Sequence, residues 1–166
     1  MAVRIFGAAR PVTLQAIEPG VILLADDHNG KRLIGIGVED DHGPLFVVLW
    51  SAGDISAPYV LEPSDVHRSV SVIDGDLELE AVEPFKALLD RTLRNDGLFV
   101  TADKQIGVAV SMPGYSGRTD QRRHFRLSDG RKMTENGGAH ALLGPVNAYV
   151  RYEGRQDRVP LWIAET

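Results

Sequence analysis

Short apolar runs alternate with polar turns along most of the chain. The runs recur about every 8–14 positions, which is typical of β-strands joined by tight turns. Three early runs, separated by turns rich in Asp, Asn and Gly, predict a meander: Val21–Ala25, Arg32–Val38 and Leu45–Trp50. Two later pairs predict hairpins: Leu98–Thr101 with Ile106–Met112, and Val146–Tyr152 with Val159–Ile163.

The dipeptide Asp74-Gly75 lies between two segments of alternating polarity, His67–Ile73 and Asp76–Val82. Asp-Gly is a strong signal for a two-residue hairpin turn, so these segments are expected to pair. The expected register sets Val72 opposite Leu77. The same alternation assigns the apolar residues to a buried face and the polar residues to a wet one. The buried set is Val70, Val72, Leu77 and Leu79, and the wet set is Ser69, Ser71, Glu78 and Glu80.

One segment, Pro84–Asn95, has the period of an amphipathic helix. Its apolar stripe is formed by Phe85, Leu88, Leu89 and Leu93. Pro84 suits the first helical position and Gly97 suits the position after the end. Ala139–Leu143 predicts at most one helical turn. The small residues of the strand at 106–112 are Gly107, Ala109 and Ser111, and we expect this helix to pack on them.

These elements predict an α+β protein, mainly an antiparallel sheet of hairpins, with a barrel-like arrangement possible, and one main packed helix. With 166 residues, a single domain over 1–166 is expected. Alternating strand–helix units are missing, which argues against a doubly wound nucleotide-binding fold. No cofactor-binding motif is found, so no cofactor is expected.

The composition and charge of the chain exclude some classes of function and location. The net charge is −5, which argues against general nucleic-acid binding, although the residues from 101 onward carry ten basic and seven acidic side chains. Arginine supplies 14 of the 18 basic residues, as in proteins from GC-rich genomes. The chain has no cysteine, and no apolar run is long enough to span a bilayer. A soluble, cytoplasmic protein without membrane contact is expected.

A basic row at alternate positions, Arg122, His124 and Arg126, is the strongest candidate binding site. Side chains two apart on a strand share a face, and arginine forks suit carboxylates or phosphates. Arg118, in the glycine-rich loop 113–120, and His140 are added as ligand-binding candidates. The alternative is that this row has no binding role. Like the acidic row of Asp76, Glu78 and Glu80, it would then be a solvent-exposed face or would form ion pairs with a neighbouring strand.

Three functional hypotheses remain. The leading one is a non-enzymatic binding module for a protein partner or a small anionic ligand. The second is a small hydrolase or isomerase that uses His124, His140 and Glu135 beside the 113–120 loop. The third is a structural subunit, such as a homo-oligomer, whose exposed β-edges pair between copies. No metal is expected, because the turns Asp26-Asp27-His28 and Asp40-Asp41-His42 should lie at opposite ends of a sheet.

Overall fold

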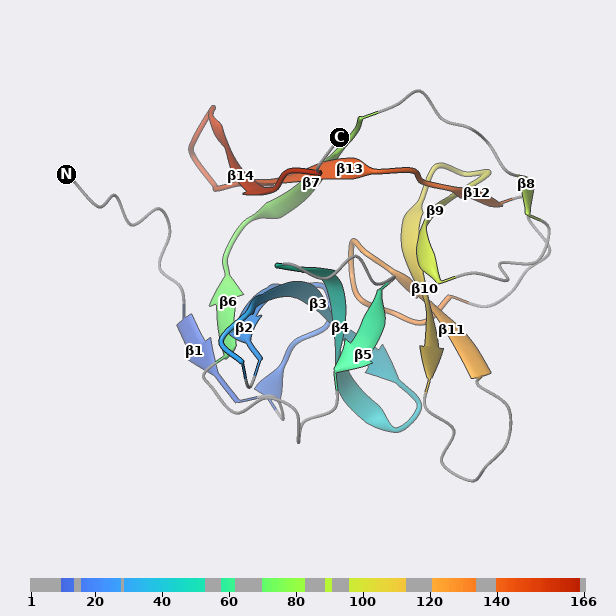
Figure 1. The fold of residues 1–166 in the computed structure, drawn as a ribbon, viewed down its shortest axis with the longest axis horizontal. Helices are drawn as coiled ribbons and strands as arrows, with labels where there is room; N and C mark the ends of the chain where they lie inside the picture. The colour runs from blue at the N-terminus through green and yellow to red at the C-terminus, as the bar shows by residue number, and fades with distance from the viewer. Residues whose placement is uncertain are drawn as a thin grey trace.

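The structure is a computed structural model, and it describes most of the chain. The described residues are 10–13, 16–27, 29–52, 58–61, 70–82, 89–90, 96–112, 121–133 and 140–164. Over these ranges the chain forms strands and turns (Figure 1). The strands are β1 Arg10–Val12, β2 Ile22–Asp26, β3 Arg32–Asp40, β4 Gly43–Ser51, β5 Tyr59–Leu61, β6 Val70–Ile73, β7 Asp76–Ala81, β8 Leu89–Asp90, β9 Gly97–Thr101, β10 Ile106–Met112, β11 Gln121–Arg126, β12 His140–Leu142, β13 Val146–Arg151 and β14 Arg158–Trp162.

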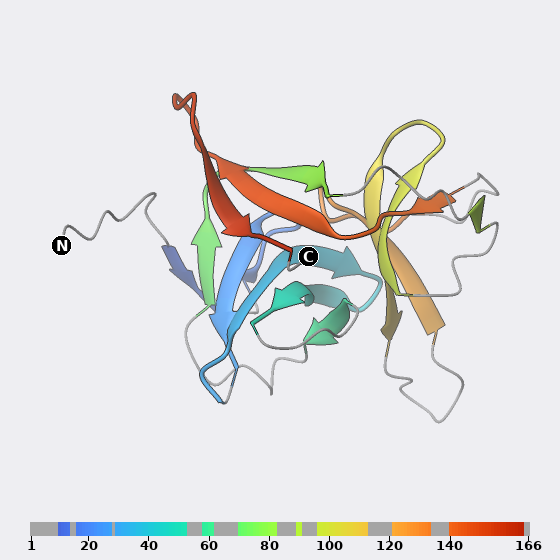
Figure 2. The same cartoon turned by 45° about the horizontal axis from the view of Figure 1, so that its top comes forward.

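The strands make three antiparallel sheets. A six-stranded sheet has the order β1-β6-β2-β3-β4-β5, a five-stranded sheet has the order β11-β10-β9-β12-β8, and a three-stranded sheet has the order β14-β13-β7. Figure 2 shows the three-stranded sheet lying across the top of the other two. The predicted meander, β2-β3-β4, and the hairpins β9-β10 and β13-β14 are confirmed.

The predicted α+β class, with its main packed helix, is wrong. The described residues contain no helix, and they form an almost entirely antiparallel β structure. Leu89 and Asp90, in the middle of the expected helix, form β8, while the rest of 84–95 lies outside the described residues. The expected helical turn at 139–143 is also wrong, because His140–Leu142 is β12.

These two corrections have one cause. β8 and β12 pair with each other, Leu89 opposite Ala141 and Asp90 opposite His140. Each segment therefore gains backbone hydrogen bonds from a partner some 50 residues away along the chain. Helical periodicity is a weak local preference, and non-local pairing of this kind overrides it.

The hairpin predicted at Asp74-Gly75 is wrong as well, although the alternation holds within each strand. Val70 and Val72 are buried in the inner cluster, Leu77 and Leu79 pack against the main core, and Ser69 lies outside the described residues. β6 pairs with β1 and β2 in the six-stranded sheet, and β7 pairs with β13 in the three-stranded sheet. The chain crosses from one sheet to the other at this bend (Figure 1). A Cβ on Gly75 would lie 2.7 Å from Cγ1 of Val150, so glycine is needed here for close approach to β13.

The central strands of the six-stranded sheet, β3 and β4, are buried on both faces. The sheet curls around an inner cluster to which all six strands contribute (Figure 1): Val12, Leu23, Ala25, Leu33, Phe46, Val48, Tyr59, Leu61, Val70 and Val72. On β3, Gly35 leaves room for the ring of Phe46, and Gly37 leaves room for Ile17. A larger residue at either position would overlap these side chains, so the glycines permit the tight packing inside the curl.

The main core lies between this sheet and the other two. The outer faces of β3 and β4 contribute Ile36, Val38, Val47 and Leu49, and the five-stranded sheet contributes Leu98, Val108, Val110 and Phe125. Val146 of β13 closes the cluster from the three-stranded sheet. All three sheets therefore share one apolar core.

The outer face of the three-stranded sheet carries cross-strand ion pairs. Glu78 of β7 is opposite Tyr149, and its carboxylate is held by both Nε and Nη2 of Arg151. Glu80 accepts hydrogen bonds from Arg158 at 3.1 and 3.2 Å and from the Tyr149 hydroxyl at 2.9 Å. Two members of the acidic row, Glu78 and Glu80, thus pair with arginines of their own sheet, which is one of the alternatives left open by the sequence.

Candidate ligand-binding cleft

The predicted basic row lies along β11, and both of its arginines pair with carboxylates of this chain. Arg122, His124 and Arg126 alternate along β11, opposite Ser111, Ala109 and Gly107 of β10. Nε of Arg122 donates to Oδ1 of Asp96 at 2.8 Å, and the hydroxyl of Ser111 donates to the same oxygen at 3.0 Å. Nη1 of Arg126 lies 3.0 Å from Oδ2 of Asp129. Each guanidinium is therefore already bound to a carboxylate of this chain.

His124, in the middle of the row, is a buried residue. It is 8% exposed, and its ring meets the ring of Phe99 edge-on, with the centroids 5.8 Å apart. Gly107 and Ala109 provide the space for this pair, since a Cβ on Gly107 would overlap the ring of Phe99. The small face of β10 therefore accommodates an aromatic side chain of its own sheet, where the sequence predicted a helix.

The structure does not bring the two candidate histidines together. β11 and β12 are separated by β10 and β9, which places their backbones about 14 Å apart across the sheet. His124 is in register with Gly97 of β9 through Ala109, whereas His140 pairs with Thr101, about 13 Å further along the strand. Arg118, Glu135 and the loop 113–120 lie outside the described residues, as does the side chain of His140.

The two Asp-rich turns serve local structure. Oδ1 of Asp27 accepts the backbone N–H groups of Asn29 and Lys31, both at 2.8 Å, and so closes the turn before β3. At the far end of β3, Asp40 is nearly fully buried and lies 3.6 Å from Nε of Arg123. Nζ of Lys132 lies 2.5 Å from Oδ2 of the next residue, Asp41, and this ion pair lowers the pKa of the Asp41 carboxyl group. Among the described residues no group of three acidic or histidine side chains is arranged to hold a metal ion.

A cleft that the sequence did not indicate lies where the three sheets meet. Its volume is about 470 Å³, within the range of small-molecule sites. It is bounded by the segment before β2, the β6–β7 bend, the β9–β10 turn and the turn after β11. The lining residues are Gly20, Gly75, Asp76, Leu77, Leu79, Lys104, Gln105, Ile106, Leu127 and Ser128.

The apolar wall of the cleft consists of the aliphatic side chains at 77, 79, 106 and 127. Leu77, Leu79 and Ile106 pack against the main core but are only half-buried, so part of their apolar surface remains accessible. Alternation along β7 points the two leucines toward the core, and Glu78 and Glu80 point to the opposite face. The cleft therefore exposes a wall of core residues to solvent.

The polar rim is built on a tightly bonded turn. Thr101 and Gln105 exchange hydrogen bonds, with the N–H of Thr101 donating to O of Gln105 at 2.9 Å and the N–H of Gln105 donating to Oγ1 of Thr101 at 3.0 Å. Lys104 adopts the left-handed conformation, φ 63°, and its N–H donates to O of Thr101 at 2.9 Å. Among described residues, Lys104 is the one non-glycine in that conformation, which fixes where its side chain leaves the turn.

The charges at the rim are uneven. Asp76 belongs to the outward-facing row of β7, opposite Arg151. The pKa of the Arg151 guanidinium is raised mainly by Glu78, and the charge of Asp76 raises it further. Asp103, beside Lys104, accepts hydrogen bonds from the side chains of Thr101 and Gln105. Lys104 itself makes no ion pair with any described residue. The charged residues that line the cleft are therefore Lys104, an ammonium group without an ion pair in the described part of the chain, and Asp76, which is opposite Arg151 of the neighbouring strand.

Comparison with known proteins adds no relative to this description. Searches of protein-family models, curated proteins and solved structures found no match to the chain. Over the described residues, no helix has the length and apolar character needed to cross a membrane. Over the described residues the fold and the cleft define the class: three antiparallel β-sheets that share one core, with a cleft at their junction that is lined by aliphatic side chains, Lys104 and Asp76.

Proposed function

We propose that this protein is a non-enzymatic binding module and that the cleft between the three sheets binds a small ligand. One observation carries the proposal: half-buried core side chains, Leu77, Leu79 and Ile106, line a cleft of about 470 Å³. Small-molecule sites are usually preformed clefts with an apolar lining and a few polar groups. Because its walls come from three sheets that share one core, this cleft is held in shape without a ligand.

The alternatives receive less support. The enzyme hypothesis relied on His124 and His140 acting together, and these residues lie on strands separated by two others. The subunit hypothesis needs exposed edges that can pair, yet edge strands β1 and β14 carry Pro11 and Pro160, which lack the N–H needed for a ladder. A protein partner would need an apolar patch, and Ile163 is the one large apolar side chain that is exposed among the described residues.

The experiment fills the cleft without touching the core. Ser128 is exposed and lines the cleft, so Ser128→Trp should block it while leaving the fold intact. Ala102→Trp adds the same bulk at an exposed position of the β9–β10 turn that does not line the cleft. Binding of a panel of small alcohols, amines and carboxylic acids is measured by ligand-observed NMR on the intact chain.

The expected result is that at least one class of compound binds the unmodified protein and the Ala102→Trp variant, and that Ser128→Trp abolishes this binding. Both variants should keep the thermal midpoint of the parent. If no compound binds, or if binding survives Ser128→Trp, the proposal is wrong.

A further inference from the structure

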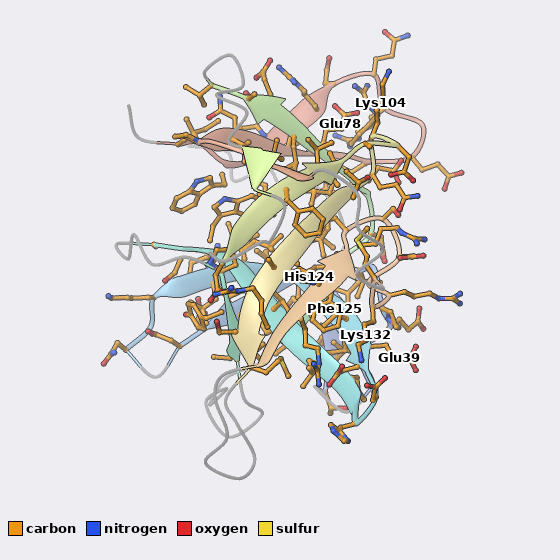
Figure 3. The ribbon with its side chains drawn as sticks, turned by 90° about the vertical axis from the view of Figure 1, so that its right-hand side faces the viewer. Glu39, Glu78, Lys104, His124, Phe125 and Lys132 are labelled. Carbon is orange, nitrogen blue, oxygen red and sulfur yellow. The ribbon has the colours of Figure 1, made fainter. Side chains whose placement is uncertain are left out.

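Lys104 is the one ammonium group among the described residues that line the cleft. It stands at the end of the β9–β10 hairpin, at the same end of the molecule as Glu78 (Figure 3). Two carboxylates lie near it in the sequence or in the lining of the cleft. Asp103 is bonded within the turn, and Asp76 belongs to the outward-facing row of β7, where it is opposite Arg151. An ammonium group without an ion pair, beside a wall of aliphatic side chains, is complementary to a negative charge carried on an apolar body.

The other rim groups fit the same head group. Ser128 contributes a hydroxyl, which donates a hydrogen bond to an anionic oxygen as readily as to a neutral one. Gln105 contributes little, since its amide nitrogen already donates to Oδ2 of Asp103 at 2.7 Å. One ammonium and one hydroxyl match a singly charged carboxylate.

We infer that the ligand of this cleft is a small organic carboxylate with an aliphatic body, oriented by Lys104. This inference rests on the proposed function, since it names the ligand class of the same site. The aliphatic part packs on Leu77, Leu79 and Ile106, and the carboxylate lies at the rim beside the ammonium group of Lys104. It also moves the anion site predicted from sequence away from the β11 arginines, which are bound to Asp96 and Asp129.

The test uses three probes that share a six-carbon chain: hexanoate, hexanol and hexylamine. Dissociation constants are measured by ligand-observed NMR at low salt for the intact protein and for Lys104→Met, which keeps the length of the side chain and removes its charge. Lys104→Arg restores the charge. Lys31→Met is the matched control, because Lys31 is an exposed lysine on a turn that does not line the cleft.

Hexanoate should bind about two- to fivefold more tightly than hexanol, the range expected for one exposed ion pair, and hexylamine should bind most weakly. Lys104→Met should reduce hexanoate affinity to that of hexanol without changing hexanol affinity. Lys104→Arg and Lys31→Met should both keep the preference for hexanoate, and added salt should weaken it.

The outcomes separate the two proposals. If hexanol and hexanoate bind equally and Ser128→Trp abolishes both, the cleft is a ligand site and the carboxylate inference is wrong. If hexylamine binds most tightly, the inference is also wrong, and Asp76 becomes the orienting group. If no probe binds, the proposed function and the inference fail together. A preference for hexanoate that survives Lys104→Met places the anion elsewhere.

Discussion

The six-stranded and three-stranded sheets of this protein use the same strand geometry for opposite environments. In the six-stranded sheet, β3 reads Arg-Leu-Ile-Gly-Ile-Gly-Val and is buried on both faces, one inside the curl and the other against the main core. In the three-stranded sheet, β7 reads Asp-Leu-Glu-Leu-Glu-Ala, with leucines toward the core and glutamates toward solvent. The difference shows which property of a side chain, its shape or its polarity, decides whether it fits a strand position in each sheet.

In the six-stranded sheet, shape decides which residues fit. The middle of β3, from Leu33 to Val38, is apolar whichever way its residues point, and glycines at 35 and 37 admit larger neighbours. In the three-stranded sheet, polarity decides: a shift of one residue would bury Glu78 and expose Leu77. We therefore expect the first sheet to be sensitive to volume and the second to be tolerant of volume but sensitive to charge.

The largest expected difference is between two leucines. Leu23 of β2 is fully buried inside the curl, so Leu23→Ala should reduce the free energy of unfolding by about 2–5 kcal/mol. Leu79 of β7 is half-buried at the edge of the cleft, so Leu79→Ala should cost about 1 kcal/mol. Urea unfolding of both variants measures the difference. Equal losses would show that the two sheets are not packed as differently as their burial indicates.

A pair of glycines comes next. Gly35→Ala would place a methyl group over the ring of Phe46 and the carbonyl oxygen of Val47, so we expect a loss of about 3 kcal/mol. Gly144 has open space around its Cβ position, and Gly144→Ala should change stability by less than about 0.5 kcal/mol. Thermal unfolding compares them. A Gly35→Ala variant as stable as Gly144→Ala would refute the close packing inside the curl.

Two carboxylates test the electrostatic side of the comparison. The side chain of Asp40, at the end of β3, is 2% exposed and lies 3.6 Å from Arg123 and 3.9 Å from Lys132. Asp40→Asn removes the charge that these two cations face, and it should cost about 2 kcal/mol. Glu78→Gln, on a face open to solvent, should shift the urea midpoint less than Asp40→Asn does. The reverse order would mean that the ion pairs of Glu78 and Glu80 on the three-stranded sheet contribute more than surface ion pairs normally do.

The smallest expected effect is a change in acid sensitivity. The hydrogen bond from Arg151 lowers the pKa of Glu78 below its ordinary 4.5, and hydrogen bonds from Arg158 and then Tyr149 lower that of Glu80. Groups with a lowered pKa in the folded state stabilise the fold above their ordinary pKa, and this contribution is lost as pH falls through the lowered value. The urea midpoint of E78Q/E80Q should therefore fall less steeply than that of the parent below pH 4.5. If the urea midpoints of the variant and the parent fall equally steeply with pH, the ion pairs of Glu78 and Glu80 are not a source of acid sensitivity.

Local features of the fold followed from the sequence at most turns between neighbouring strands. Asp74-Gly75 is the exception, because its turn signal and the flanking alternation agreed and yet the two strands belong to different sheets. The meander β2-β3-β4 and the hairpin β9-β10 were predicted because neighbouring strands joined by short turns pair with each other. The faces of β6 and β7 were predicted by alternation, although their pairing was not. The helix prediction failed because the pattern at Leu89 carried no information about its distant partner, Ala141.

The candidate site was harder to predict than the fold. The basic row on β11 was correctly placed on one face, but its carboxylate partners were not identified from the sequence. Asp96 is 26 residues from Arg122 along the chain, and Glu78 is 73 residues from Arg151. Which acid meets which arginine depends on how the sheets dock, and side-chain type alone does not specify that.

The sequence by itself determined the positions of most strands, their inward and outward faces, and the tight turns that join neighbours, because these depend on contacts within a few residues. The tertiary structure alone decided the rest. It sent β6 and β7 into different sheets, paired β8 with β12, and brought the turns at 75, 104 and 128 around one cleft. These features depend on contacts between segments far apart in the chain. Bringing such segments together costs conformational entropy, and this cost is offset only when the whole core assembles.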